Sequence, residues 1–302
     1  MRAVDREKVR FVSGGTERIA WHYPGTNGAC VVMAGGFAVT KEPATDMFAQ
    51  RFHEVGYAVL AFDYSGLGES SGEPRLVLPI RHQLADWQAA IDYARTLPDV
   101  DPARVAIWGF SASGGHLFPV AAGNPDLAAV IAQTPHVGGL ASLRNASRYQ
   151  KPLARLRFTG RGMLDALGSL VGFAPRLVPL AGPPGSVAVL TTPDAQDGAL
   201  ALDASSHPDW QQAVAARSAL RFAFYRPGRY AFRVRSPLLA VVCDDDATTP
   251  AQLTIGAVRS APRAEVVRLP GGHYEPFLGG HERAVDAELS FLREHVLDRV
   301  LA

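Results

Sequence analysis

Short apolar runs rich in Val, Ile and aromatic residues alternate along the chain with longer segments whose apolar residues recur at helical spacing. Several middle runs are continuously apolar, which is typical of strands buried on both faces of a sheet. The alternation predicts an α/β fold with a mostly parallel central sheet and helices on both faces. The eight predicted strands lie within residues 8–13, 18–23, 29–35, 57–64, 104–110, 127–135, 237–244 and 264–270. The helical segments between them are 46–56, 80–98, 250–262 and 281–297.

One long connection, from residue 137 to residue 235, interrupts this alternation. It contains two segments with helical spacing, 154–172 and 209–225, separated by a Pro/Gly-rich stretch. A structureless loop of that length is implausible inside a compact domain. We therefore predict a helical cap at 137–235, inserted after the sixth strand into an α/β core formed by 1–136 and 236–302. An independent second domain is the alternative.

Composition narrows the class of protein without identifying a function. The chain has 302 residues, of which 47% are hydrophobic and 20% charged, and these values predict a folded globular protein. A net charge of +1 gives no electrostatic case for nucleic acid or an anionic membrane surface, so we expect neither as a partner and a small molecule as the substrate. No apolar run reaches the roughly 18–20 residues of a membrane span, and the charged first residues lack a signal core. Cys30 and Cys243 lie in apolar runs, so we expect core residues in a reducing compartment and a cytoplasmic protein.

The candidate nucleophile lies in RVAIWGFSASGGHLFPVAAG, residues 104–123, which predicts a strand, a sharp turn and a helix. A nucleophilic serine on such a turn needs small residues two positions before and two positions after it. Both Ser111 and Ser113 fit this template. Because the strand should end at Gly109, the turn falls on Ser111, which we predict as the nucleophile, with Ser113 packing in the helix. A glycine-rich turn without chemistry is the alternative.

A serine hydroxyl becomes a good nucleophile only when a base accepts its proton and a third group fixes the tautomer of that base. Three consecutive aspartates follow the seventh predicted strand, and Asp246 is our candidate acid. Asp244 and Asp245 are alternatives, and the run could also be a solvated turn. The glycine-rich loop after the last strand holds His273, the candidate base. These residues complete the chain order nucleophile, acid, base that α/β enzymes of this kind use.

An oxyanion formed at the substrate needs two N–H donors. We expect one from Ala112, which follows the candidate nucleophile at the start of a helix. The other is expected from Phe37, because Gly35 and Gly36 allow the backbone to turn sharply after the third strand. A plain glycine turn is the alternative there.

Five segments together resemble the capped serine α/β-hydrolases, an esterase-like superfamily related to the X-Pro dipeptidyl peptidase and dienelactone hydrolase groups. They read VVMAGGF, FDYSGLGESSGEPR, WGFSASGGH, AVVCDDDATTP and LPGGHYEP, and they span nearly the whole predicted core. The resemblance implies the α/β-hydrolase fold with an inserted cap. The chain departs from the family pattern at Gly35, where a histidine is usual, and at Ser113, where the second glycine of G-x-S-x-G is usual.

These features predict a serine hydrolase that uses an acyl-enzyme to cleave an ester, thioester or lactone of a small apolar or aromatic molecule. We expect no metal or organic cofactor, because the chemistry needs neither and no clustered His/Cys metal spacing is present. His136, Trp210, Phe224 and Tyr64 are candidates for contact with substrate, although the cap aromatics could equally form the cap's own core. The alternatives are a tailoring hydrolase of a polyketide-like metabolite, acting by lactone or epoxide opening or chain release, and a non-catalytic ligand-binding homologue. A homodimer is left open.

Overall fold

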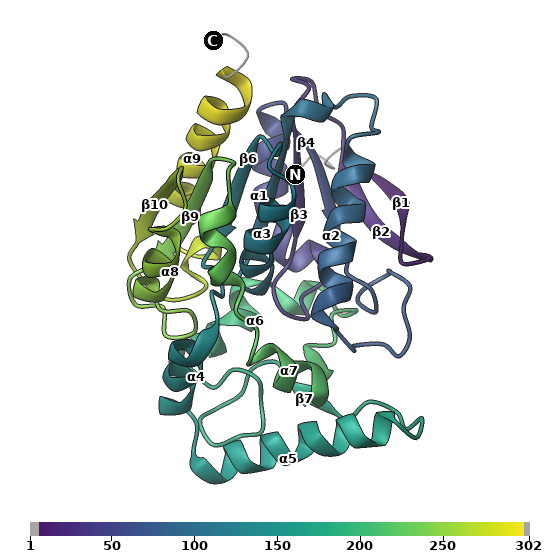
Figure 1. The fold of residues 1–302 in the computed structure, drawn as a ribbon, viewed down its shortest axis with the longest axis vertical. Coiled ribbons are helices and arrows are strands. Elements are labelled where there is room, and N and C mark those ends of the chain that lie inside the picture. The colour runs from purple at the N-terminus through teal and green to yellow at the C-terminus, as the bar shows by residue number, and fades with distance from the viewer. Residues whose placement is uncertain (1–5, 299–302) are drawn as a thin grey trace.

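The fold of this protein, seen in a computed structural model, is described for residues 6–298, with the side chains of residues 139 and 140 left aside. A single eight-stranded sheet runs through the core in the order β1-β2-β4-β3-β5-β6-β9-β10 (Figure 1). β1 and β2 form an antiparallel hairpin at one edge, β2 also pairs antiparallel with β4, and the remaining pairs are parallel. The strands are β1 (Glu7–Ser13), β2 (Thr16–Tyr23), β3 (Cys30–Ala34), β4 (Ala58–Phe62), β5 (Val105–Phe110), β6 (Ala129–Gln133), β9 (Leu238–Cys243) and β10 (Ala264–Leu269).

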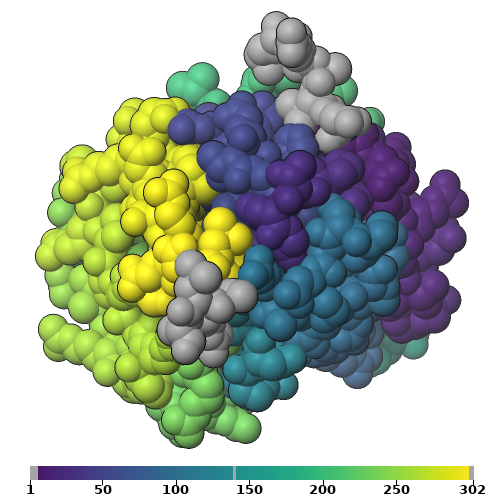
Figure 2. Space-filling view, turned by 90° about the horizontal axis from the view of Figure 1, so that it is seen from above, coloured from purple at the N-terminus to yellow at the C-terminus, as the bar shows by residue number. Residues whose placement is uncertain are grey.

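Helices cover both faces of this sheet, as the alternating pattern predicts. α1 (Lys41–Glu54) and α9 (His281–Leu292) pack on one face and lie side by side, as the view from above shows (Figure 2). The other face is covered by α2 (Ile80–Ala94), α3 (Ala112–Gly123) and α8 (Ala251–Val258). Successive residues of the central strands enter opposite halves of the core: Val31 and Met33 face α1, while Val32 and Ala34 face α2. Burial on both faces explains why these strands are continuously apolar.

Residues 137–235 leave the sheet after β6, return before β9, and lie at one end of the core, below it in Figure 1. This segment contains α4 (Gly139–Arg148), α5 (Pro152–Ser169), α6 (Gly198–Ala201), α7 (Ala216–Phe222) and a small ribbon of β7 (Leu177–Pro179) and β8 (Ala213–Ala215). Short 3-10 helices lie at Pro102–Arg104, Pro193–Asp197, Ala204–Ser206, Pro227–Arg233 and Glu275–Phe277, and a π-helical turn at Arg293–Leu297 follows α9.

The predicted helix over 209–225 is wrong in its first half. Its early residues form β8, and only Ala216–Phe222 are helical. The N–H groups of Ala215 and Ala216 donate to the carbonyl oxygens of Leu76 and Arg176, so partners distant in sequence hold the chain extended. Among residues 6–298, no helix combines the length and apolar character needed to cross a bilayer.

Candidate active site

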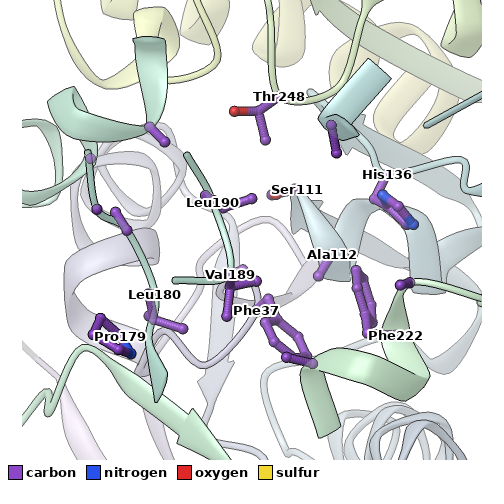
Figure 3. A pocket seen from close by; sticks show the side chains of 18 of the residues that line it. Phe37, Ser111, Ala112, His136, Pro179, Leu180, Val189, Leu190, Phe222 and Thr248 are labelled. Carbon is purple, nitrogen blue, oxygen red and sulfur yellow. The ribbon is translucent and has the colours of Figure 1, made fainter. Parts of the chain in front are cut away.

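Ser111 occupies the turn between β5 and α3 with φ 55° and ψ −111°. A positive φ is costly for a residue with a side chain, and such strain is found most often at functional sites. The turn is tight, because a Cβ atom on Gly109 would lie 2.7 Å from the backbone of Ser113. β5 ends at Phe110, one residue later than the expected Gly109, and the Ser111 hydroxyl faces a cavity (Figure 3).

Ser113 lies in the first turn of α3 and is fully buried. Four groups form a hydrogen-bonded chain there. The indole N–H of Trp87 donates to the Tyr64 hydroxyl at 2.7 Å, and the Tyr64 and Ser113 hydroxyls are 2.5 Å apart. Ser113 in turn donates to the carbonyl oxygen of Gly35. Since that bond uses the Ser113 proton, Tyr64 must donate to Ser113, and both buried hydroxyls are satisfied.

This series of hydrogen bonds gives a different role to Tyr64, which we expected to contact substrate. The Tyr64 side chain is buried behind the turn between β5 and α3, which we call the elbow. Tyr64 is not among the residues that line the cavity. Tyr64 lies two residues beyond the end of β4, and its ring packs edge-on against Phe62. The expectation that Tyr64 contacts substrate is therefore wrong. Through Ser113, Tyr64 instead connects the elbow to Gly35 in the loop after β3.

His273 and Asp246 complete a line of hydrogen-bonded groups that begins at Ser111. The Nε2 atom of His273 lies 2.9 Å from the Ser111 Oγ atom, and its Nδ1 atom lies 2.8 Å from Asp246 Oδ2. Both His273 and Asp246 are buried. The two alternatives for the acid lie elsewhere: Asp245 is exposed, and exposed Asp244 pairs with Arg268 at 2.8 Å.

Thr249, which the sequence analysis did not single out, fixes the orientation of the Asp246 carboxylate. Its N–H donates to Asp246 Oδ1 at 2.5 Å, and its hydroxyl donates to Oδ2 at 2.7 Å. The signal available in the sequence is a threonine three residues after an aspartate, the spacing of a capping interaction at a loop.

A second carboxylate, Asp194, comes from the cap and was also missed. Its Oδ2 atom accepts the N–H groups of Ala247 at 2.8 Å, Thr248 at 3.2 Å and His273 at 3.2 Å. Burial opposes ionisation, but hydrogen bonds from Thr192, the nearby His273 and the donors at Thr248 and Ala247 lower the pKa of Asp194. One cap residue therefore joins the two loops that carry Asp246 and His273.

The two residues expected to supply N–H donors, Phe37 and Ala112, line the same cavity as Ser111. Ala112 is the first residue of α3, and an N–H at that position has no acceptor within its own helix. Phe37 follows Gly36, and a Cβ atom on Gly36 would lie only 3.2 Å from the Phe110 ring, so the loop passes close to the elbow. Figure 3 shows Phe37, Ser111 and Ala112 around the same space.

The cavity has a volume of about 780 Å³ and lies between the core and the cap. Its lining includes His136, Trp210 and Phe224, three of the residues proposed from sequence for contact with substrate, and is otherwise largely apolar. The His136 ring lies 4.7 Å from the ring of Phe222, and burial lowers the pKa of His136 to about 4. At pH 7 His136 is therefore uncharged, and it lines the cavity as a neutral side chain. Trp210 is held in place by an indole N–H bond of 2.8 Å to the carbonyl oxygen of Ala38.

The other cap aromatics take different positions. Phe173 is exposed at the end of α5, and Tyr225 lies 3.0 Å from Nδ1 of His116. Phe222 lines the cavity and packs on Phe37 at 4.6 Å, so the cap aromatics divide between cavity and surface.

A strained serine elbow, a Ser–His–Asp line and a cap over a mixed sheet define the class of the protein as an α/β-hydrolase. The chain belongs to the alpha/beta hydrolase family, whose sequence model matches residues 24–287. It is 40% identical to the quorum-quenching protein AidA of Acinetobacter baumannii over 294 residues, covering 95% of this chain and 94% of the relative. It is 31% identical to the polyketide transferase ATR5 of Stachybotrys chlorohalonatus over 188 residues, 61% of this chain and 60% of the relative. The structure of the alpha/beta hydrolase GrgF of Penicillium sp. matches with a TM-score of 0.80 at 23% identity, over 97% and 99% of the two chains, which shows the shared fold.

Proposed function

We propose that the protein is a serine hydrolase that cleaves a carboxylic ester, thioester or lactone through an acyl-enzyme. The single observation that carries this proposal is the line Ser111–His273–Asp246, with distances of 2.9 and 2.8 Å, opening into the cavity. A nucleophile within hydrogen-bond reach of a base, itself oriented by a carboxylate, is the arrangement that nucleophilic catalysis requires.

In the proposed reaction, His273 Nε2 takes the Ser111 proton while Oγ attacks the carbonyl carbon of the substrate. The negative charge that develops on the carbonyl oxygen is stabilised by the N–H groups of Phe37 and Ala112. Asp246 holds the His273 ring in the required tautomer and stabilises the imidazolium. His273 then protonates the leaving group, the acyl group remains on Ser111 Oγ, and water activated by His273 releases it.

The cavity supports a proposal for the substrate class. Its volume of about 780 Å³ lies within the range of small-molecule sites, and its lining is mostly apolar with few polar groups. Phe37, Phe158 and Phe222 line it from both the core and the cap. We therefore propose an apolar or aromatic acyl compound of modest size. The name of the AidA relative states quorum quenching, and lactones among the substrates are consistent with removal of a diffusible signal.

A second candidate is tailoring of a polyketide-like metabolite by lactone or epoxide opening or chain release. Relatives named polyketide transferases favour this alternative. In such a transfer the same acyl-enzyme would be released by an alcohol or amine instead of water. Comparing hydrolysis with transfer to added alcohols, in one assay on one acyl donor, separates the two outcomes.

Labelling with a fluorophosphonate probe tests the nucleophile directly. We expect one label on the peptide containing Ser111, none in Ser111→Ala, and normal labelling in a Ser113→Ala control. A panel of esters, thioesters, lactones and epoxides with graded acyl length then identifies the bond type. A wild-type protein that is folded but neither labels nor turns over any of these compounds would instead be a non-catalytic ligand-binding homologue.

A further inference from the structure

The net charge of +1 conceals a strong separation of charge between the two parts of the chain. Residues 137–235 contain thirteen Lys and Arg but five Asp and no Glu, a net charge of +8, which leaves −7 for the rest. Between residues 138 and 176 there are seven cations and one acid, Asp165, which is buried against Arg217 at 2.9 Å. The cap therefore presents a strongly basic surface, which the overall charge does not reveal.

The same part of the cap exposes a row of large apolar side chains. They lie on α5 and the turn that follows it, and each is between 56% and 81% exposed: Leu153, Leu156, Met163, Leu164, Leu167, Leu170, Val171 and Phe173. Isolated exposed leucines are ordinary, but a contiguous row along one helix is typical of an interaction site. We call these eight residues the α5 ridge.

The ridge cannot be buried by a rotation of α5, because the opposite face of the helix is fixed. Asp165 accepts the N–H groups of Arg176 and Arg217 and pairs with the Arg217 guanidinium, all at 2.8–2.9 Å. Gly162 packs so closely on α7 that a Cβ atom there would lie 3.0 Å from Leu220. The inward face of α5 is thus committed to the cap, while the ridge side chains are exposed. α5 itself lies at the end of the molecule opposite α9 (Figure 1).

We propose that the α5 ridge and its cations dock the cap onto an anionic lipid surface. A helix with aliphatic side chains on one side and flanking arginines is the pattern of interfacial membrane binding. Arg157 and Arg161 are exposed on α5 itself, and Arg144, Arg148 and Lys151 are exposed beside it. α5 runs along the outer edge of the molecule (Figure 1), so its exposed ridge is free to insert among lipid chains. A second copy of the chain is disfavoured as the occupant, because docking through this face would bring together two caps that each carry a net charge of +8 and repel one another.

Docking would also bring the site close to apolar acyl compounds dissolved in the bilayer. Arg155, Phe158 and Thr159, on the same helix as the ridge, line the cavity. The docking proposal does not rest on the hydrolase proposal, because it is tested by binding alone.

Sedimentation with lipid vesicles tests the docking. We expect the full chain to bind vesicles of equal parts phosphatidylglycerol and phosphatidylcholine at about 0.1 M salt, with binding falling as salt screens the charges. Pure phosphatidylcholine should bind at least tenfold more weakly. Leu164→Glu/Leu167→Glu should reduce the partition coefficient at least tenfold. Leu200→Glu is the matched control, since Leu200 is a cap leucine that is 79% exposed outside the ridge, and it should bind as the wild type does.

Circular dichroism and turnover of a water-soluble ester verify that each variant is folded. Sedimentation velocity without lipid tests the alternative that a second copy of the chain, and not a lipid surface, covers the ridge. A dimer that Leu164→Glu/Leu167→Glu converts to a monomer would overturn the proposal in favour of a second copy of the chain. The proposal also fails if wild-type protein does not bind the anionic vesicles, or if the ridge variant binds them as well as Leu200→Glu does.

Discussion

Removing the Asp194 side chain should disturb the site although Asp194 touches neither Ser111 nor substrate. In Asp194→Ala, the N–H groups of Ala247, Thr248 and His273 lose a shared acceptor, and the Thr248 hydroxyl loses a 2.9 Å partner. A hydrogen bond to a charged group contributes about 1.5–3 kcal/mol, but these donors share one carboxylate, and Ala247 and Thr248 are only half-buried. We therefore expect a loss of about 2–4 kcal/mol in the free energy of unfolding.

The kinetic effect should fall mainly on kcat. Without Asp194, the loops that carry His273 and Asp246 are no longer joined, and a small displacement of the base weakens proton transfer from Ser111. We expect a loss of about 10²-fold in kcat, because even a 1 Å misplacement has costs of this size, with little change in KM. Asp194→Asn retains an amide oxygen for the N–H donors and an NH₂ group for Thr248, so it should retain most of the stability. It should lose several-fold in kcat, because a negative charge near the imidazolium is gone.

Steady-state kinetics, urea unfolding and the rate of fluorophosphonate labelling measure these effects. Asp209→Ala, which removes an exposed cap carboxylate, is the control and should behave as the wild type. An Asp194→Ala protein that loses stability but keeps wild-type kcat and labelling rate would refute the positioning role. Asp194 would then only fasten the cap to the core.

Three further outcomes follow from the same geometry. Ser111→Ala should lose at least about three orders of magnitude in turnover while staying folded, whereas Ser113→Ala should keep most activity but unfold about 1–3 kcal/mol more easily, as measured by urea titration. Asp246→Asn should be severely impaired because the amide favours the wrong His273 tautomer, while exposed Asp244→Asn should not; comparable losses in both would mean that the acid is misidentified. Burial lowers the pKa of His116 to about 3, so the unfolded chain takes up a proton first as pH falls below about 6.5. Stability should fall by about 2 kcal/mol from this group between pH 7 and pH 5, and His116→Gln should show a correspondingly flatter profile.

The sheet could be predicted from sequence because its signal is local. Each central strand is a short apolar run. Such a run is typical of a parallel strand that is buried on both faces of its sheet. The β7–β8 ribbon could not be predicted, because the alanine-rich stretch at 213–216 fits a helix equally well. What makes that segment extended is its pairing with residues 177–179 and with Leu76, which lie far away in sequence.

Some residues of the candidate site could likewise be predicted from the sequence, and others could not. Ser111, Asp246 and His273 follow strands, and the edge of a parallel sheet brings strand ends together. Asp194 lies in an irregular part of the cap, where a single aspartate looks like any surface residue until the cap folds over the loops. The position of Tyr64 depended on which way the chain turns after β4, and neighbouring residues do not determine that.

The chain of hydrogen bonds from Trp87 through Tyr64 and Ser113 to Gly35 bears on how such sites can diverge. A glycine at 113 would give the usual G-x-S-x-G pattern but would leave the Tyr64 hydroxyl proton without an acceptor and the buried Gly35 carbonyl without its donor. A phenylalanine at 64 would remove the first of these costs but would leave the buried indole N–H of Trp87 without its acceptor. We therefore expect the identities of residues 64, 87 and 113 to be inherited together, with Tyr and Trp beside Ser. A lineage changing one of them alone would pass through a less stable intermediate, so this small polar contact restricts the order in which substitutions can accumulate.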